Sequence, residues 1–337
     1  MAEDRDALSR EAYAGAVREA ENAVLEHADH QPHHGYTPAA FRHYVRQRAL
    51  LSALDSLTFA SVLDVGCAEG YFMKVVRDRF GASVWGVDLS TTALAKAHGL
   101  YGFPVAAAEA TRLPFADGSF DLVLSTEVIE HVLDPDLMVA EMRRVSRKTV
   151  LVTTPVSQSA DEHEPDFDLQ AEGHINNFDP TTVRRLFGEE ATLGSFRCNA
   201  TLAMIVGVGR HLPSGMRDAF YGLDHAVSQR LGSPVHRVKA LRNRDWLITV
   251  PATSQGEGTL EWRCPACHGQ LQREHESEPE LLRCGSCGTA YALAGEVPDF
   301  FKAANATDTA DTADAADTAD AADAADTADA ADAADAS

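Results

Sequence analysis

Between residues 61 and 154, short β-rich segments alternate with segments whose apolar residues recur at helical spacing. The predicted strands are Ser61–Val65, Ser83–Val87, Val105–Ala108, Phe120–Ser125 and Lys148–Thr153. This order predicts a doubly wound α/β fold, in which helices cover both faces of a parallel sheet. Ligands of such sheets bind beyond the carboxyl ends of the strands. That edge of the sheet is therefore where a functional site is expected.

A loop with two glycines joins the first strand to the helix after it, within the sequence VLDVGCAEG from Val62 to Gly70. Gly66 permits a tight turn, and Gly70 leaves room for a ligand against the backbone. The N–H groups that begin the helix favour an anionic group of a ligand. The dinucleotide-binding fingerprint G-x-G-x-x-G does not match this loop.

Three acidic residues lie at the ends of the first three predicted strands: Asp64 inside the first, Asp88 after the second and Glu109 after the third. A carboxylate at Asp88 can accept hydrogen bonds from two ribose hydroxyls, and one at Glu109 can accept from the amino group of a base. Each acid alone is compatible with a solvated strand end. The three in this order indicate a ligand that contains a nucleoside.

The motifs together resemble those of the class I S-adenosylmethionine-dependent methyltransferase family. Val62–Gly70 is similar to the first motif of that family, Trp85–Ser90 to the second, and Glu109–Ser125 to the third and fourth. The resemblance covers about residues 45–200. It implies a Rossmann-like, seven-stranded, mostly parallel sheet whose last strand is antiparallel. Ala68 departs from the family, which often has glycine there.

The resemblance implies S-adenosylmethionine as the cofactor. Asp64, Gly66 and Gly70 would hold its methionine part, Asp88 its ribose, and Glu109 with the backbone of Ala110 its adenine. The family more often has Asp where Glu109 stands. The complete set of implied cofactor-binding positions is Asp64, Gly66, Cys67, Gly70, Asp88, Leu89, Glu109, Ala110 and Thr126. The thiols of Cys67 and Cys198 are interpreted as unreactive core groups.

A candidate catalytic group, Glu127, Glu130 and His131, directly follows the fourth predicted strand. If a helical turn begins there, the three side chains share one face. Two carboxylates and an imidazole could then hold Mg²⁺, which would lower the pKa of a bound hydroxyl. This pattern resembles the metal-supported O-methyltransferases of ubiquinone biosynthesis and of small-RNA 2′-O-methylation. The alternatives are that His131 acts as a general base or a positioning residue without metal, or is structural.

His174 is a second candidate catalytic residue. It lies in the segment GHINNF, residues 173–178, at the end of a polar insert that spans residues 155–178. The matching segment of the family often closes the active-site pocket, so the insert is expected to fold over the cofactor. The alternative is a loop histidine that caps the following helix.

Two pairs of cysteines, Cys264–Cys267 and Cys284–Cys287, are separated by 16 residues. This spacing predicts a closed tetrahedral Zn²⁺ site, which is structural because no ligand position stays open. The alternative is that the four thiols lie unligated in loops. A module of about 40 residues would then lack the metal or disulfide that such small modules need for stability.

The cysteine segment resembles the small zinc-ribbon partner of tRNA and release-factor methyltransferases. The similar stretches are Cys264–Leu271, Leu282–Tyr291 and Gly295–Phe301, although Tyr291 is followed by Ala-Leu where that family usually has Pro-Ile. In that family the ribbon stabilises a catalytic subunit through an edge strand. The resemblance therefore implies either a stabiliser carried in cis or a surface that binds substrate or a partner protein.

Four regions are predicted: an N-terminal helical lid (1–57), a methyltransferase domain (58–251), a zinc ribbon (259–301) and a tail (302–337). Asp recurs at every third position of the tail, which gives no coherent apolar face and predicts disorder. Elements expected outside the alternating core are helices at Ala12–Leu25, Phe41–Leu54, Pro180–Phe187 and Met216–Leu231, and strands at 193–206 and 244–250.

The formal net charge is −22, and ten of the acids lie in the tail. An acidic surface repels phosphate backbones, so nucleic acid is a less favoured partner. No run of 18 apolar residues predicts a membrane span, the charged N-terminus does not resemble a signal peptide, and the paired cysteines fit a cytoplasmic location.

The combined motifs favour an O-methyltransferase that acts on a small molecule, a lipid or a glycan. Amide and base N-methyltransferases often have Asn-Pro-Pro-Tyr where Ser125-Thr-Glu-Val stands here. The alternatives are an RNA or protein methyltransferase that uses the ribbon to bind its substrate or a partner, and a non-catalytic scaffold. No motif specifies the acceptor or the oligomeric state.

Overall fold

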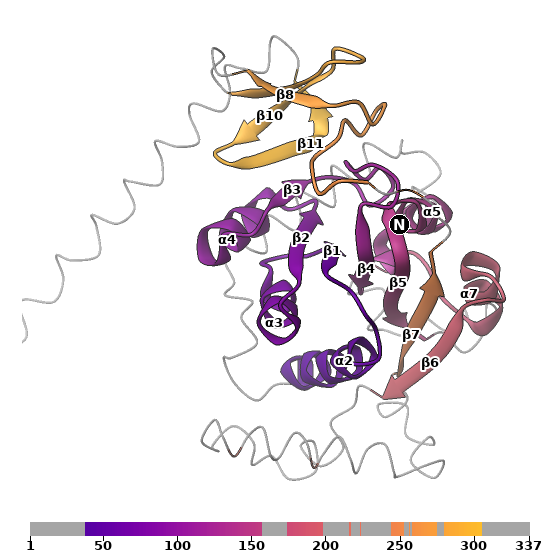
Figure 1. Cartoon of the computed structure of the whole chain (residues 1–337). Coiled ribbons are helices and arrows are strands. Elements are labelled where there is room, and N and C mark those ends of the chain that lie inside the picture. The colour runs from indigo at the N-terminus through magenta and orange to yellow at the C-terminus, as the bar shows by residue number, and fades with distance from the viewer. Residues whose placement is uncertain are drawn as a thin grey trace, which may run out of the picture.

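The structure is a computed structural model that describes residues 38–156, 174–197, 216, 223, 244–252, 256, 258–274 and 280–304 (Figure 1). Two of the expected elements, the helix Ala12–Leu25 and the Asp-rich tail, lie outside the described residues. Nearly all of the expected helix Met216–Leu231 and most of the insert at 155–178 lie outside them as well.

One continuous sheet of eleven strands organises the described part of the chain. Its order is β6-β7-β5-β4-β1-β2-β3-β11-β10-β9-β8. The strands are β1 (Ser61–Val65), β2 (Ser83–Asp88), β3 (Val105–Ala107), β4 (Phe120–Thr126), β5 (Ser146–Pro155), β6 (Thr192–Arg197), β7 (Arg244–Pro251), β8 (Leu271–Glu274), β9 (Leu281–Cys284), β10 (Ala290–Ala294) and β11 (Val297–Ala303).

Strands β1 to β5 are parallel to one another, as the alternating sequence pattern predicts. Strand β7 is antiparallel to both of its neighbours, β5 and β6. The sheet has eleven strands rather than the seven expected, because the C-terminal segment adds four strands at the edge formed by β3. The expected strand at 193–206 is described only as far as Arg197, the end of β6.

Local sequence signals mark the beginnings of two of the described helices. The described helices are α2 (Pro38–Leu54), α3 (Tyr71–Phe80), α4 (Thr91–Tyr101), the 3₁₀ turn η1 (Ile129–His131), α5 (Pro135–Val145) and α7 (Pro180–Phe187). Ser90 caps α4 by accepting a hydrogen bond from the N–H of Ala93 at 3.1 Å, and Asp134 caps α5 in the same way. The sequence predicts a helix from Pro135 to about Arg147. Helix α5 instead ends at Val145, because β5 already begins at Ser146.

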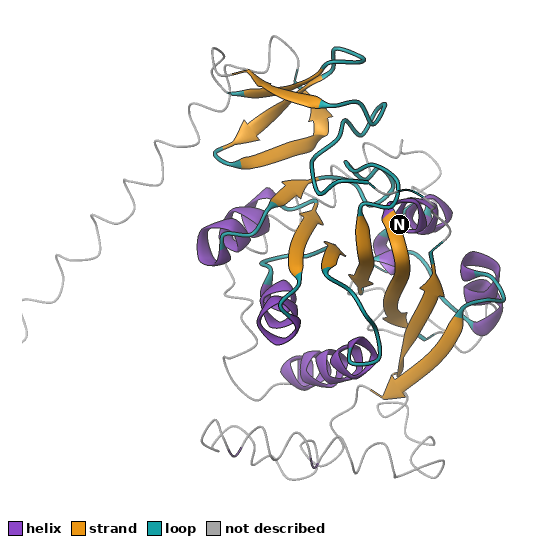
Figure 2. Ribbon diagram, in the orientation of Figure 1, coloured by secondary structure: helices purple, strands orange, loops and turns teal. Residues whose placement is uncertain are grey.

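Adjacent residues of the central strands face opposite sides of the sheet, and each side carries a buried core. Leu63 of β1 is buried with residues of α5 and α7, whereas its neighbour Val62 is buried with residues of α2, α3 and α4. Figure 2 shows these helices on the two sides of the sheet. None of the described helices combines the length and the apolar character that a membrane crossing requires.

Residues 258–274 and 280–304, here called the C-terminal module, lie against the edge of the sheet at the top of Figure 1. Strand β11 pairs in parallel with β3, with Asp299 opposite Ala107. The ring of Trp262 lies 4.9 Å from that of Trp85 and 5.0 Å from that of Phe115. The module therefore shares an aromatic core with the rest of the chain instead of standing apart as a separate globule.

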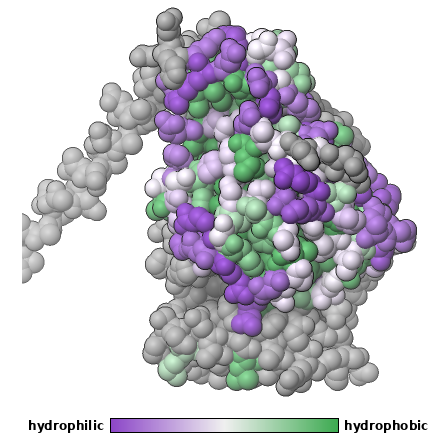
Figure 3. Space-filling view, in the orientation of Figure 1, coloured by the Kyte–Doolittle hydropathy of each residue, from purple (hydrophilic) through white to green (hydrophobic). Residues whose placement is uncertain are grey.

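The outer strands of the C-terminal module carry charged side chains, and Figure 3 shows a mostly hydrophilic surface there. Arg283 of β9 pairs with Glu274 of β8 at 2.6 Å, and Arg273 of β8 pairs with Glu280. Charged side chains on an outer strand discourage further strands from pairing with it.

Candidate functional site

The glycine loop between β1 and α3 has the backbone conformation that its glycines predict. Gly66 has a φ of 81° and Gly70 a φ of 75°, both in the left-handed region. A Cβ on Gly66 would collide with the side chain of Val128, and one on Gly70 would lie 3.0 Å from the Cβ of Ala97. Ala68 also has a positive φ, 45°, so the alanine that departs from the family motif stands in a strained conformation.

Asp88, at the end of β2, ties the glycine loop to the sheet. Its carboxylate accepts a hydrogen bond from the N–H of Ala68 at 2.8 Å and one from the N–H of Ser90 at 2.9 Å. Burial raises the pKa of Asp88, and these backbone donors offset part of that rise. A carboxylate has about four acceptor sites, so Asp88 keeps capacity for ligand hydroxyls.

Asp64 is the most unusual group of this region, because it is a buried carboxyl with an unmatched oxygen. Its side chain is 4% exposed, and its Oδ1 has no hydrogen-bond partner among the described residues. Burial, with a smaller contribution from the charge of Asp88, raises the pKa of Asp64 to about 8. A buried acid of this kind is stabilised when a positively charged group binds beside it. Asp64 therefore fits the cationic methionine part of S-adenosylmethionine.

The other expected cofactor positions lie at the ends of neighbouring strands. Glu109 follows β3 and accepts a hydrogen bond from the hydroxyl of Thr111 at 3.0 Å, and Ala110 beside it is half-buried. Leu89 and Thr126 are half-buried at the ends of β2 and β4. Parallel pairing of β4-β1-β2-β3 brings these strand ends to one edge of the sheet. The structure thus gathers the expected positions at the edge where ligands of this fold bind.

Cys67 lies in the same loop, and its thiol is buried. Burial, followed by the nearby charges of Asp88 and Asp64, raises the pKa of Cys67 well above its ordinary value. A thiol that stays protonated is a poor nucleophile. Cys198, the other cysteine expected to be unreactive, lies outside the described residues.

The turn after β4 differs from the helical turn expected there. Glu127 adopts a φ of 58°, in the left-handed region, and only Ile129–His131 form a short 3₁₀ turn. Glu127, Glu130 and His131 therefore do not form the expected group of three on one helical face. The group that the structure gathers is Glu130, His131 and His174, whose ligand atoms all lie within 4.8 Å of one another.

The residues around His174 are hydrogen-bonded to that turn. The N–H groups of Ile175 and Asn176 donate to the carbonyl oxygen of Glu130 at 2.9 and 3.1 Å. The side-chain amide of Asn176 donates to the carbonyl oxygens of Val132 at 2.6 Å and Ile129 at 3.2 Å. These bonds place the ring of His174 4.8 Å from the ring of His131. Asn176 was not singled out in the sequence, because an asparagine in a polar loop carries no signal of its own.

Glu130 is the buried acid of this group, with 1% of its side chain exposed. Its Oε2 accepts a hydrogen bond from the hydroxyl of Thr154 at 3.1 Å, and its Oε1 lies 4.0 Å from Nε2 of His174. Burial raises the pKa of Glu130 well above its ordinary value, and the charge of Glu127 raises it further. A positive charge on a neighbouring imidazole, or a cation held there, would stabilise the ionised carboxylate.

Glu127 contacts a different set of residues. Its Oε2 lies 2.6 Å from Nη2 of Arg46 on α2, and its Oε1 accepts a hydrogen bond from the hydroxyl of Thr153 at 3.0 Å. The same Arg46 contacts Asp245 of β7 at 2.9 Å. Neither Arg46 nor Asp245 was identified from the sequence, since both lie in segments without a motif.

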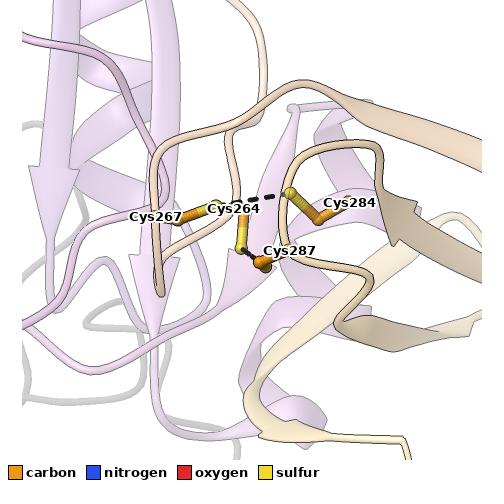
Figure 4. Close-up of side chains that lie close together, drawn as sticks. All are labelled: Cys264, Cys267, Cys284 and Cys287. Carbon is orange, nitrogen blue, oxygen red and sulfur yellow. Dashed lines mark hydrogen bonds between the residues drawn. The ribbon is translucent and has the colours of Figure 1, made fainter.

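The four cysteines of the C-terminal module converge on one point (Figure 4). The Sγ atoms of Cys264 and Cys287 are 3.7 Å apart, and those of Cys267 and Cys284 are 3.4 Å apart. Four thiolates around Zn²⁺ at about 2.3 Å have sulfur–sulfur separations of about 3.8 Å. The four Sγ atoms lie within 4.8 Å of one another, which fits a tetrahedral metal site.

Two matching turns present these sulfurs. The N–H of His268 donates to the carbonyl oxygen of Cys264 at 2.7 Å, and the N–H of Gly288 donates to that of Cys284 at 2.9 Å. His268 and Gly288 occupy equivalent positions and both have positive φ, 55° and 78°. Glycine adopts this conformation freely, whereas His268 is held in it at some cost.

Comparison with known proteins identifies the domain around the glycine loop. Residues 63–152 match a family model described as a methyltransferase domain. Ajmaline N-methyltransferase of Rauvolfia serpentina is 32% identical over 197 residues, which cover 51% of this chain and 65% of that protein. A probable chloroplastic tocopherol O-methyltransferase of Oryza sativa subsp. japonica is 35% identical over 137 residues, which cover 34% of this chain and 37% of that protein. The chain thus spans less than two thirds of the length of either relative.

Among solved structures, geranyl diphosphate C-methyltransferase from Streptomyces coelicolor A3(2), in complex with Mg²⁺, geranyl diphosphate and S-adenosyl-L-homocysteine, superposes with a TM-score of 0.50. The match covers 72% of this chain and 98% of that chain at 16% identity, so it shows a shared fold. Together these matches show that residues 63–152 are similar to methyltransferase domains and that the described chain shares the α/β fold of the structural neighbour.

Proposed function

We propose that the protein is an S-adenosylmethionine-dependent O-methyltransferase that acts on a small molecule, a lipid or a glycan. The observation that carries this proposal is the group of Glu130, His131 and His174 at the carboxyl end of β4, beside the strand ends that would hold the cofactor. A buried carboxyl next to two imidazoles is suited to take a proton from a hydroxyl group. Relatives named for ajmaline and tocopherol support a small-molecule acceptor.

In this proposal, residues at the ends of β1, β2 and β3 would bind the cofactor. Asp64 would pair with its cationic part, Asp88 would accept hydrogen bonds from its ribose hydroxyls, and Glu109 and Ala110 would contact its adenine. Gly66 and Gly70 would keep the loop in the conformation that binds the cofactor, because any side chain there would meet Val128 or approach Ala97. Bound S-adenosylmethionine supplies an electrophilic methyl group on a sulfonium.

The proton of the acceptor hydroxyl would pass to His131 as general base. Glu130 would stabilise the imidazolium that results, since its own ionised form needs a positive neighbour. His174, held against the turn by the hydrogen bonds of Asn176, would orient the acceptor or share the proton. The deprotonated acceptor oxygen would be the nucleophile, and S-adenosylmethionine held by Asp64, Asp88 and Glu109 would supply the methyl group.

The same three side chains could instead hold a divalent cation that polarises the acceptor hydroxyl. The metal ligands would then differ from Glu127, Glu130 and His131, the set expected from the sequence. Glu127 pairs with Arg46, and His174 replaces it as the third ligand. Two imidazoles and one carboxylate suit Mn²⁺, Fe²⁺ or Zn²⁺ better than Mg²⁺, which prefers oxygen ligands.

The C-terminal module is proposed to be a zinc ribbon that stabilises the methyltransferase domain in cis, within the cytoplasm, where thiolates stay reduced. The sulfur geometry supports Zn²⁺ as its structural metal. The pairing of β11 with β3 and the packing of Trp262 against Trp85 support the stabilising role. An alternative role is that the ribbon binds a partner protein or a macromolecular acceptor.

Transfer of a labelled methyl group tests the reaction. The purified protein is incubated with methyl-labelled S-adenosylmethionine and host extract, which is then fractionated into lipid, glycan, RNA, protein and small molecules. Label in the lipid, glycan or small-molecule fraction supports the proposal. Label in RNA or protein favours the macromolecular acceptor. Of these two acceptors RNA is the less favoured, because a protein with a net charge of −22 repels its phosphate backbone. No label in any fraction, with Zn²⁺ and Mn²⁺ supplied, indicates a non-catalytic scaffold.

A further inference from the structure

A buried ionic contact joins the turn that carries the proposed catalytic group to two distant parts of the chain. Arg46 of α2 is 7% exposed and Asp245 of β7 is 3% exposed. Nε and Nη2 of Arg46 donate to Oδ2 of Asp245 at 3.1 and 2.9 Å, and Nη2 also donates to Oε2 of Glu127 at 2.6 Å. Arg46 and Asp245 both lie outside residues 63–152, the segment that matches the methyltransferase domain.

We propose that Arg46 is a positioning residue of the methyl-transfer centre and that α2 is therefore part of the active site. This proposal rests on the proposed function and assigns to Glu127 a role that differs from metal ligation. Arg46 holds Glu127, and Glu127 in turn fixes the start of the turn that presents Glu130 and His131.

The backbone conformation of Glu127 shows why the contact with Arg46 is needed. Its φ of 58° lies in the left-handed region, which costs free energy for any residue with a Cβ. Conformations of this kind persist only where surrounding contacts over-determine them. Contacts with described residues do so here: the N–H of Glu127 donates to the carbonyl oxygen of Thr153 at 3.0 Å, and its side chain accepts from Thr153 and from Arg46.

The position of the turn matters for the chemistry because Glu130 and His131 come three and four residues after Glu127. If Glu127 relaxes to a right-handed conformation, the chain that follows changes direction, and Glu130 and His131 move relative to His174. A misplacement of about 1 Å at a reacting group costs on the order of 100-fold in rate. Loss of Arg46 is therefore expected to reduce turnover without touching the cofactor residues Asp64 and Asp88.

A structural role of Arg46 must be separated from this positioning role. Arg46→Ala removes the arginine that Glu127 and Asp245 share, and loss of one partner of a buried ionic contact can unfold the protein on its own. The double variant Arg46→Met with Asp245→Asn limits this effect, because it keeps the side-chain volume and removes the buried charge of Asp245. Glu127, whose side chain is 18% exposed and accepts from Thr153, is then the carboxylate that loses the contact with Arg46. Replacement of a buried ion pair by neutral groups of similar volume is often neutral for stability. The matched control is Arg48→Ala, an exposed arginine of the same helix.

The experiment measures three quantities for each variant: affinity for S-adenosylhomocysteine by calorimetry, transfer of labelled methyl to the acceptor fraction, and hydrogen exchange of the peptide that contains residues 127–132. In the double variant we expect the affinity to stay within about threefold, the turnover to fall about 100-fold, and the exchange to become faster in this peptide. Arg46→Lys keeps the charge but loses the fork of donors, so it should recover part of the turnover. Arg48→Ala should match the wild type in all three.

Turnover of the double variant within about threefold of the wild type, with unchanged exchange, overturns the role of Arg46. If the wild type transfers no methyl group to any fraction, the proposed reaction fails while the exchange measurement still decides about Arg46. If residues 127–132 exchange faster in the double variant than in Arg48→Ala, the result supports the proposal that Arg46 positions the turn. Equal exchange in the two variants rejects that proposal.

Discussion

The cysteine cluster of the C-terminal module and the group of Glu130, His131 and His174 are assembled in opposite ways. All four cysteines come from 24 consecutive positions, Cys264 to Cys287, and two matching turns present their sulfurs. The second group joins a turn after β4 to a segment more than 40 residues later. The turn also contacts Arg46, which pairs with Asp245, 199 positions away in the sequence.

The difference separates two ways of building a site. Two short turns and one metal ion can define a cysteine cluster, so its geometry depends little on the rest of the fold. A group that depends on an insert, on α2 and on β7 forms only when the whole sheet is in place. Changes at the first site should therefore act mainly on stability, and changes at the second mainly on turnover.

The largest effect is expected from loss of a cysteine ligand. Cys284→Ser should release the metal and unfold the C-terminal module, since binding of structural Zn²⁺ contributes on the order of 10 kcal/mol to folding. Elemental analysis and thermal unfolding of the purified protein measure both consequences. Ser286→Ala, in the same turn, should retain one Zn²⁺ per chain and the melting temperature of the wild type. Wild-type protein that contains no zinc would contradict the proposal.

The contact between the module and the sheet should show the next largest effect on stability. Trp262→Ala removes a ring that packs against Trp85, Phe115 and Phe300, and it should lower the free energy of unfolding by about 3–5 kcal/mol. Urea unfolding measures this loss. Leu260→Ala, at a side chain that is 37% exposed, is the control and should have little effect. If Trp262→Ala unfolds in two separate transitions, the module and the sheet no longer form one cooperative unit.

Turnover should depend on the second group without a matching loss of stability. His131→Ala removes the proposed base and should lower the rate of methyl transfer about 10²–10⁴-fold, the usual contribution of general acid–base catalysis. Affinity for S-adenosylhomocysteine should stay near that of the wild type, because the residue lies outside the glycine loop. Leu137→Ala, an exposed neighbour on α5, serves as the control. A rate that is unchanged in His131→Ala would exclude the base and leave His131 structural.

The smallest predicted effect is a pH dependence of cofactor binding that arises from Asp64. In the free protein its pKa is raised to about 8, so the group is protonated below that pH, and binding of a cationic cofactor would release the proton. Affinity should therefore rise with pH, by up to about tenfold per unit, and level off above pH 8. Calorimetry in buffers of different ionisation enthalpy detects the released proton. Asp64→Asn should remove this dependence. If the affinity of the wild type for the cofactor does not change with pH, Asp64 is not the group that pairs with the cationic part of the cofactor.

The same pKa shift affects the free protein. Because the pKa of Asp64 is higher in the folded chain than in the unfolded chain, the folded state binds more protons between about pH 4 and pH 8. The contribution of this group to stability is therefore present at low pH and is lost as the pH rises through about 8.

Much of the fold was predictable because it depends on local signals. Ser90 and Asp134 begin helices by capping their first N–H groups, and Gly66 and Gly70 adopt the positive φ that the loop requires. The alternation of strands and helices predicted the parallel order of β1 to β5. The strand count could not be predicted, because nothing in β11 itself specifies that β3 is its partner.

The candidate site was predictable only in part. Asp64, Asp88 and Glu109 follow from their places at strand ends, but the partners of Glu127 do not, because pairing with Arg46 joins residues 81 positions apart. The turn after β4 was expected to be helical, and the left-handed conformation of Glu127 and the 3₁₀ turn at Ile129–His131 depend on contacts made by β5 and α2.

The sequence alone determined the local elements: the glycine loop, the order of strands and helices, and the spacing of the four cysteines. These features depend on backbone sterics and on ligands that lie close along the chain. The tertiary structure decided that His174 joins Glu130 and His131, that Arg46 withdraws Glu127 from this group, and that β11 extends the sheet beside β3. Such contacts form between distant segments only after the core has packed, so the pattern of residues within any one segment cannot encode them.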